Sequence, residues 1–349
     1  APVAADVEIR LAAVLDRKTD RRVSGAAHEA VYRRSPGSAL GRRHAVTAVT
    51  HYAAVNNKVV YSQAATLAEE LLAAFPRGIS AEESGWQAVA QWRRGNEWAK
   101  SNSAAAKLLA KGLPATPLRK RQLHLMMGEN YGRLGQWANA TDSYIKARAA
   151  NDSHDVHYLV ITALSNNQAA KPAQMAAVVN DSLRKYPARP DRFDRLGLLA
   201  NKHVQAKDLP NANRIYAQLL PLSARSHGAA SAYLRTRGNE PADHAASEKV
   251  LLDAINRNPS HPDKAYLGYV LAFELYRDRM KQVEKTRTTL RQLVSGWPSN
   301  ESYSTNAASW LFSNATSDAE FNAEVTRYLA SRKRVPQLTS FQGVLAGWI

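Results

Sequence analysis

The sequence predicts an all-α protein built from one kind of helix pair used many times. Apolar residues recur with the spacing of one helix face, as at Leu67, Leu71 and Phe75. No stretch alternates like a strand, and no Asn-Gly type of turn joins β-branched runs. Prolines that follow apolar helical runs recur at a nearly constant interval, which indicates a repeat longer than one helix.

These prolines mark the ends of the repeated units, because proline cannot continue a helix and pushes its predecessor out of the α region. The markers are Pro36, Pro76, Pro114, Pro187, Pro221, Pro259, Pro298 and Pro336, with Asn151-Asp152 in the one double-length gap. Successive intervals are 40, 38, 37, 36, 34, 38, 39 and 38 residues. We therefore expect one repeat domain of about nine antiparallel helix pairs over residues 1–336. Residues 337–349 are expected to form an apolar cap or to begin a further segment.

Each unit has room for two helices of about fourteen residues and two short turns. The stretch RRGNEWAKSNSAAAKLL at 93–109 restates RLGQWANATDSYIKA at 133–147 with one inserted residue. In both, a basic residue and a glycine close one helix and Trp-Ala opens the next. Ser80–Glu83 and Ser317–Glu320 have the spacing of capping boxes at helix starts. Glu82 and Glu83 fall in a first helical turn, where the helix dipole favours acids, so we interpret them as structural.

Small and aromatic residues at fixed offsets predict how a pair packs. Counted from Arg121, positions 8, 11, 20, 24 and 27 hold Gly128, Tyr131, Ala140, Tyr144 and Ala147. This pattern resembles the tetratricopeptide repeat (TPR). The resemblance implies a superhelix (solenoid) of stacked helix pairs in which the small residues let paired helices approach closely. The alternative is an irregular helical domain with scattered prolines.

The resemblance extends by period over residues 6–336 and by motif over 120–260. Leu196-Gly197 followed by Ala212 and Tyr216 fits the same pattern, with three extra residues in the turn between the helices. Ala254 and Pro259 fit positions 27 and 32.

Composition limits the chemistry and the partners. With 47 Lys and Arg against 30 Asp and Glu, the net charge is +17, which favours anionic partners. The absence of cysteine excludes disulfides, thiolate metal sites and a thiol nucleophile. No apolar run is long enough to span a membrane. The start APVAAD resembles the end left by signal-peptide cleavage, which predicts a periplasmic or otherwise exported protein. A start at an arbitrary point of a longer, cytoplasmic chain would look the same.

Signatures of catalysis are missing from the sequence. It has no His-Glu-x-x-His helix, no Gly-x-Ser-x-Gly elbow, no phosphate-binding glycine loop and no dinucleotide fingerprint. His154 and His157 share one helix face, but no third metal ligand is apparent and we place both in an exposed first turn. The sequence therefore predicts no catalytic residue, no cofactor and no metal.

Basic residues supply the candidate binding site. The TPR resemblance implies that the first helix of each pair lines a concave groove, with position 13 facing inward. The equivalents of that position are Arg94, Arg133, Asn167, Lys202, Arg237 and Arg277, and Asn166 and Asn201 stand beside two of them. Such a stripe would attract an extended acidic ligand. The alternative is that last-turn cations only satisfy helix-end carbonyls and the helix dipole.

A second candidate is the cluster Arg119-Lys120-Arg121, which opens a helix. Positive charge is unfavourable at a helix N-terminus, so this cluster is a possible anion site.

The sequence thus predicts a non-enzymatic scaffold that binds a protein or peptide segment, expected to be acidic, in its groove. If exported, it resembles the periplasmic TPR modules of bacterial envelope or exopolysaccharide-secretion machinery. Two alternatives remain open: binding of nucleic acid or acidic polysaccharide by the basic groove, and a superhelical accessory domain of a larger enzyme.

Overall fold

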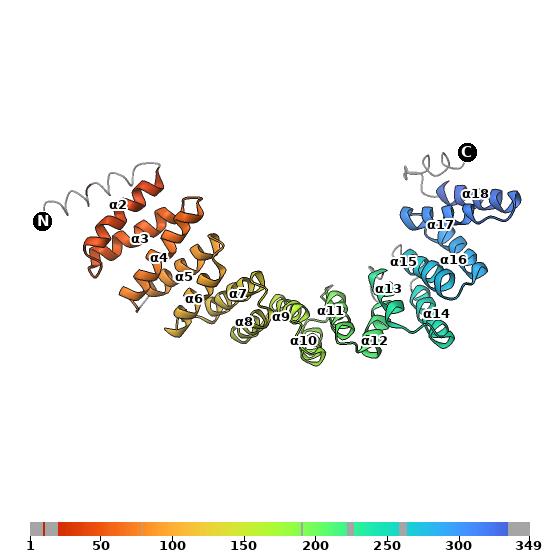
Figure 1. Ribbon diagram of the computed structural model, residues 1–349, viewed down its shortest axis with the longest axis horizontal. Coiled ribbons are helices and arrows are strands. Elements are labelled where there is room, and N and C mark those ends of the chain that lie inside the picture. The colour runs from red at the N-terminus through yellow and green to blue at the C-terminus, as the bar shows by residue number, and fades with distance from the viewer. Residues whose placement is uncertain are drawn as a thin grey trace. The chain divides into compact units, whose positions relative to one another are not determined.

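A computed structural model describes residues 10, 20–77, 79–189, 191–221, 227–257 and 264–333 (Figure 1). The chain divides into two compact units, Ala1–Ala170 and Lys171–Ile349. The expectations for the start APVAAD, for Pro259 and Pro336, and for residues 337–349 concern residues outside the described ones. The expectation of one repeat domain over 1–336 stays a prediction.

Helices account for most of each unit, and no strand occurs in the described residues. Unit 1 contains α2 (Arg21–Arg34), α3 (Ala39–Ala53), α4 (Lys58–Ala74), α5 (Ile79–Arg94), α6 (Trp98–Ala110), α7 (Pro117–Arg133), α8 (Trp137–Ala150) and α9 (His154–Asn166). Unit 2 contains α10 (Pro172–Lys185), α11 (Arg192–Gln205), α12 (Leu209–Leu219), α13 (His227–Thr236), α14 (Pro241–Asn256), α15 (Lys264–Tyr269), the π-helix η1 (Val270–Arg279), α16 (Val283–Gly296), α17 (Glu301–Ser313) and α18 (Asp318–Lys333). In unit 1 each helix packs against the next one along the chain (Figure 1).

One residue with left-handed backbone ends the first helix of several pairs. These residues are Asn96, Gly135, Lys207 and Lys281, with φ of 63°, 71°, 59° and 55°. After α5, α7 and α11 the following residue donates its N–H to the carbonyl five residues back, at 2.9 Å in each case. This is the Schellman arrangement, which stops a helix by satisfying its last carbonyls. The four residues also fix which positions of different pairs are equivalent.

Close approach of α7 and α8 confirms the predicted role of the small residues. Ala140 and Ala147 of α8 are fully buried. A Cβ atom added to Gly128 would lie 2.5 Å from Cε1 of Tyr144, so the ring occupies the space that a side chain would need. The TPR-like all-α fold predicted from the sequence is therefore confirmed. No helix among the residues in the structure is long and apolar enough to cross a bilayer.

The register predicted for two other pairs is wrong. Aligned on Lys207, the counterpart of Gly128 is the buried Ala200, and a Cβ on Gly197 would touch nothing within 4 Å. The α11–α12 turn therefore has no three extra residues. Likewise Asn96, not Gly95, is left-handed, so 94–108 matches 133–147 without an insertion. A non-glycine residue occupies the left-handed position in both turns, and the sequence pattern does not mark it.

Of the two predicted capping boxes, one marks a helix start. Ser317 precedes α18, and its hydroxyl accepts the N–H of Glu320 at 3.2 Å. The Glu320 carboxylate reaches one residue further back than predicted and accepts from the N–H and the hydroxyl of Thr316, both at 2.8 Å. Ser80 does not cap α5, because that helix already begins at Ile79.

Candidate binding surface

Two arginines of the predicted stripe occupy equivalent positions, two residues before the left-handed residue. Arg94 donates from Nη1 to the carbonyl of Ala53, the last residue of α3, at 2.5 Å. It also donates from Nη2 to the Tyr61 hydroxyl at 2.8 Å, with its guanidinium 4.2 Å from the centre of that ring. Arg133 is exposed and has no hydrogen-bond or ion-pair partner among the described residues. Arg94 thus joins neighbouring first helices, and Arg133 is available to a ligand.

Lys202 and Arg277 do not occupy that position, contrary to the sequence alignment. Lys202 lies five residues before the left-handed Lys207 and is only 2% exposed, and this burial lowers its pKa. Arg277 lies within the π-helix, where it forms two hydrogen bonds with Asp278 at 2.7 and 3.0 Å. The counterpart of Arg94 is Arg279, 3.4 Å from the carbonyl of Gly238. The register shift before Lys207 and the wider turns of the π-helix explain the difference.

The remaining members of the predicted groove bond within their own units. Asn201 accepts a hydrogen bond from the Tyr216 hydroxyl at 2.5 Å. Arg237 directly follows the last residue of α13, and its Nη1 lies 3.7 Å from Oδ1 of Asp243. Neither side chain is oriented by a neighbouring member of the stripe.

Asn166 and Asn167 line a polar hollow of about 690 Å³ between residues 135–139 and 166–169. Their side chains bond to backbone atoms of their own helix end, at 2.9 and 3.1 Å. Both amides therefore cap local backbone, although they border open space.

The basic cluster at the start of α7 reaches in two directions. Arg119 donates to Glu82 of α5 at 2.6 Å, whereas Arg121 donates to Ser153, next to α9, at 2.7 Å. Lys120 between them has no hydrogen-bond or ion-pair partner in the described part of the chain. The three side chains do not converge on one point.

Carboxylates of second helices repeatedly accept hydrogen bonds from the next first helix, a feature that the sequence analysis missed. The three cases are Tyr52 to Glu29 at 2.9 Å, Trp92 to Glu69 at 2.7 Å and Tyr276 to Glu248 at 2.8 Å. Lysines of the following second helix complete two of these sites: Lys107 lies 2.5 Å from Glu69, and Lys285 lies 2.8 Å from Glu248. Burial and this hydrogen bond raise the pKa of Tyr276 above its ordinary range.

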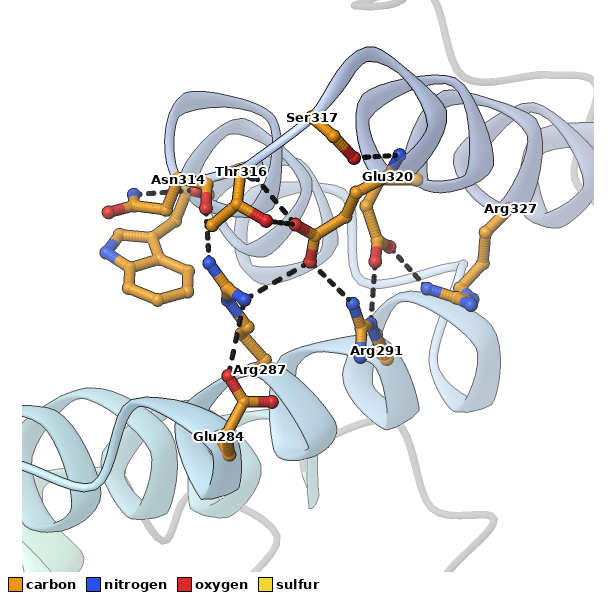
Figure 2. Close-up of polar contacts among 10 residues, drawn as sticks. Glu284, Arg287, Arg291, Asn314, Thr316, Ser317, Glu320 and Arg327 are labelled. Carbon is orange, nitrogen blue, oxygen red and sulfur yellow. Dashed lines mark hydrogen bonds and ion pairs between the residues drawn. The ribbon is translucent and has the colours of Figure 1, made fainter.

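In unit 2 a larger ion-pair network joins α16 to α18 (Figure 2). Arg291 contacts Glu320 at 3.1 Å and Glu324 at 2.6 Å, and Arg287 contacts Glu320 at 3.3 Å. Arg327 pairs with the other oxygen of Glu324, whose carboxylate is almost fully buried. Several of the cations that raise the net charge thus hold neighbouring helices together, a role that the sequence analysis did not predict.

An apolar slot lies between the first helices α3 and α5, with α4 as its floor. It has a volume of about 310 Å³ and is lined by Val46, Val49, Thr50, Ala68, Leu71, Ser80, Glu83, Ser84 and Gln87. Leu71 and Ala68 are buried, whereas Val46 is 45% exposed at the opening. This volume is at the small end of the range for ligand sites and suits one or two apolar side chains.

The slot is more apolar than its sequence suggests, because two of its three hydroxyl groups bond to their own helices. The Thr50 hydroxyl donates to the carbonyl of Val46 at 3.0 Å, and the Ser84 hydroxyl donates to that of Ser80 at 2.8 Å. Each is a bond to the preceding turn of the same helix, which leaves carbon atoms to form the walls. No sequence pattern reveals the slot, since its walls come from helices that are not consecutive.

The histidines weighed as metal ligands have structural partners. His157 is fully buried and lies 2.8 Å from Asp152, so its predicted exposure is wrong. His154 lies 3.0 Å from Asp155. Among the described residues no group of three or more His, Asp or Glu side chains is placed to hold a metal ion.

Comparison with known proteins finds no matching protein-family model and no curated relative. Solved structures match over nearly the whole chain at low sequence identity. The apo form of RapI has a TM-score of 0.40 at 8% identity and covers 96% of this chain and 99% of its own. A Rap protein complexed with competence and sporulation factor has a TM-score of 0.32 at 8% identity, with coverages of 97% and 99%. The TPR domain of P58(IPK) has a TM-score of 0.28 at 11% identity, with coverages of 96% and 100%. The likeness is one of helical fold and assigns no ligand to this chain.

Proposed function

We propose that this chain is a non-enzymatic scaffold that binds an extended segment of a protein partner on the face formed by first helices. The observation that carries the proposal is the apolar slot between α3 and α5, which is open to solvent at Val46. An exposed apolar recess on a rigid helical frame is typical of a binding site, because the frame is ordered before the partner arrives. An apolar side chain of the partner fills the recess, and its backbone crosses α3 and α5.

An acidic partner is favoured by the net charge of +17. Among the predicted groove residues, Arg133 is the contact that we retain, because it is exposed and without a partner in the described residues. Lys202 is not among the proposed contacts, because its side chain is buried.

We further propose that the protein is exported and serves in bacterial envelope or exopolysaccharide-secretion machinery. The support is the resemblance of the helix pairs to the TPR modules of such machinery. Cell fractionation of the full-length gene product tests this part: release with the periplasmic fraction supports it, and retention with the cytoplasm contradicts it.

Binding of a polyanion is the second candidate, favoured by the same charge excess. Phosphate neutralisation releases counterions, so affinity for nucleic acid should fall steeply as salt rises. Affinity governed by the apolar slot should change little with salt, because burial of apolar surface is not screened.

Panning a random dodecapeptide phage library against the whole chain tests the proposed function. Two exposed valines give a matched pair of variants: Val46→Asp places a charge in the slot, and Val59→Asp places it at the start of α4, where Val59 is 64% exposed. We expect peptides with an apolar anchor to be enriched on the wild type and on Val59→Asp, and to be lost on Val46→Asp. Equal enrichment on all three proteins, or none on the wild type, would refute the proposal.

A further inference from the structure

A carboxylate without a cation lies at the opening of the slot. Glu83 is exposed just after the first turn of α5 and lines the slot together with Gln87. Its Oε1 accepts a hydrogen bond from Nε2 of Gln87 at 3.1 Å, and no cation of the described chain pairs with it. The adjacent Glu82 differs, because Arg119 occupies it at 2.6 Å. One acid of this pair is thus used within the fold, and the other faces the slot.

A chain of hydrogen bonds along α5 orients that carboxylate. Arg94 donates to Oε1 of Gln91 at 3.4 Å, and Nε2 of Gln91 donates to Oε1 of Gln87 at 3.2 Å. Since Arg94 is itself held by the carbonyl of Ala53, each amide in the chain has a defined direction. The last donor is Gln87, which bonds to Glu83. A side chain that is already ordered loses less entropy when a ligand binds.

The helix dipole stabilises an acid near a helix start whether or not a ligand binds, so the charge alone does not make a site. The apolar slot beside it supplies the independent observation, since it places an unpaired anion next to a recess for an apolar side chain. Besides Ser80, Glu83 and Gln87 supply the polar side-chain groups of the slot, because the hydroxyls of Thr50 and Ser84 bond to their own helices.

We propose that the slot binds a peptide segment in which an apolar residue is followed or preceded by lysine or arginine. The apolar side chain enters between α3 and α5, and the cation pairs with Glu83. This inference rests on the proposed function and specifies the ligand of the same slot. Charge complementarity at the opening selects this occupant over a neutral or acidic segment.

A basic residue beside the anchor is compatible with a partner that is acidic overall. The net charge of +17 attracts acidic groups anywhere on the partner, and this attraction weakens over about 8–10 Å in physiological salt. A direct ion pair with Glu83 acts at contact distance. The two effects therefore concern different residues of the partner.

The same phage library tests the inference through the residues enriched next to the apolar anchor. On the wild type we expect lysine and arginine to be enriched there, on Glu83→Gln no charge preference, and on Glu83→Lys enrichment of aspartate and glutamate. Asp142→Lys on α8 is the control for a general change of charge, because Asp142 is exposed and lies outside the slot; it should keep the wild-type preference. Circular dichroism verifies that each variant retains its helix content.

A synthetic peptide chosen from the wild-type selection provides the quantitative test. Replacing its lysine by glutamine should weaken binding to the wild type about threefold to tenfold and leave binding to Glu83→Gln unchanged. Anchor enrichment that depends on Val46 but carries no charge preference would overturn this inference and leave the proposed function standing. Anchor enrichment that does not depend on Val46 would overturn both.

Discussion

Replacing Gly128 by alanine tests the close packing on which the helix pair α7–α8 depends. The new Cβ would lie 2.5 Å from Cε1, 2.7 Å from Cδ1 and 2.8 Å from Cζ of Tyr144. Ordinary carbon contacts are about 3.5 Å or longer, so the ring must retreat by about 1 Å. Tyr144 is only 6% exposed, so its ring is enclosed by packed side chains that resist this movement.

The expected cost follows from two opposing effects. Overpacking of a close-packed contact costs about 1–3 kcal/mol, and a rigid buried ring places this contact at the upper end. Alanine is the better helix former by about 1 kcal/mol, which offsets part of the cost. We expect Gly128→Ala to lower the free energy of unfolding by about 2 kcal/mol, or the melting temperature by about 4–8 °C.

The control is Gly197→Ala in α11, where a Cβ would meet nothing within 4 Å. This variant should gain about 0.5–1 kcal/mol from helix propensity alone. Hydrogen exchange measured by mass spectrometry assigns each change to its own helices, which matters because the two glycines lie in different units. A Gly128→Ala protein with slower exchange in α7 and α8 than the wild type would refute the packing argument.

Four further variants test the ion pairs and hydrogen bonds between helices. Arg94→Ala should cost about 1–2 kcal/mol in thermal unfolding, since it removes the bonds to Ala53 and Tyr61, whereas the equivalent Arg133→Ala should change stability by less than about 0.5 kcal/mol; equal losses would contradict the different roles assigned to these arginines. Glu324→Ala should destabilise α16–α18 by about 1–3 kcal/mol, because it removes a buried carboxylate and leaves the partly exposed Arg291 and Arg327 without this partner. Unchanged hydrogen exchange in these helices would count against the network. Burial alone would raise the pKa of Glu248, but hydrogen bonds from Lys285 and Tyr276 outweigh it and lower that pKa. The stabilisation is therefore complete above the unfolded value of about 4.3 and is lost as pH falls through the lower folded value; Glu248→Gln should flatten the loss of stability below pH ~4.3, and an unchanged acid slope would disprove this link.

The sequence predicted the features that depend on local rules. Helical periodicity and the proline interval predicted the helix pairs, and Gly128 with Tyr144 predicted how one pair packs. These predictions succeeded because they depend only on residues close in sequence. Burial of one helix face sets the spacing of apolar residues, and proline is excluded from helix interiors.

Features that depend on the turn register or on stacking were not predictable in the same way. Lys207 occupies a left-handed position that the sequence pattern does not mark, so Lys202 was assigned to the groove although it is buried. Whether an arginine meets a ligand or a carboxylate some 37 residues away depends on how neighbouring pairs stack, as for Arg119 and Glu82.

The slot itself was missed for a related reason. It requires Val46 and Glu83 to lie on first helices separated by α4, and it requires the Thr50 hydroxyl to bond to its own helix. Glu83 was interpreted as a first-turn acid alone, because the apolar recess beside it arises only when the helices pack.

Methyl resonances of the slot provide the most direct test of the proposed binding site. A peptide from the library selection would be titrated into protein with labelled valine and leucine methyl groups. We predict saturable shifts for Val46, Val49 and Leu71 and none for Val59. Shifts that avoid the slot valines, or that appear only outside α3–α5, would contradict the account.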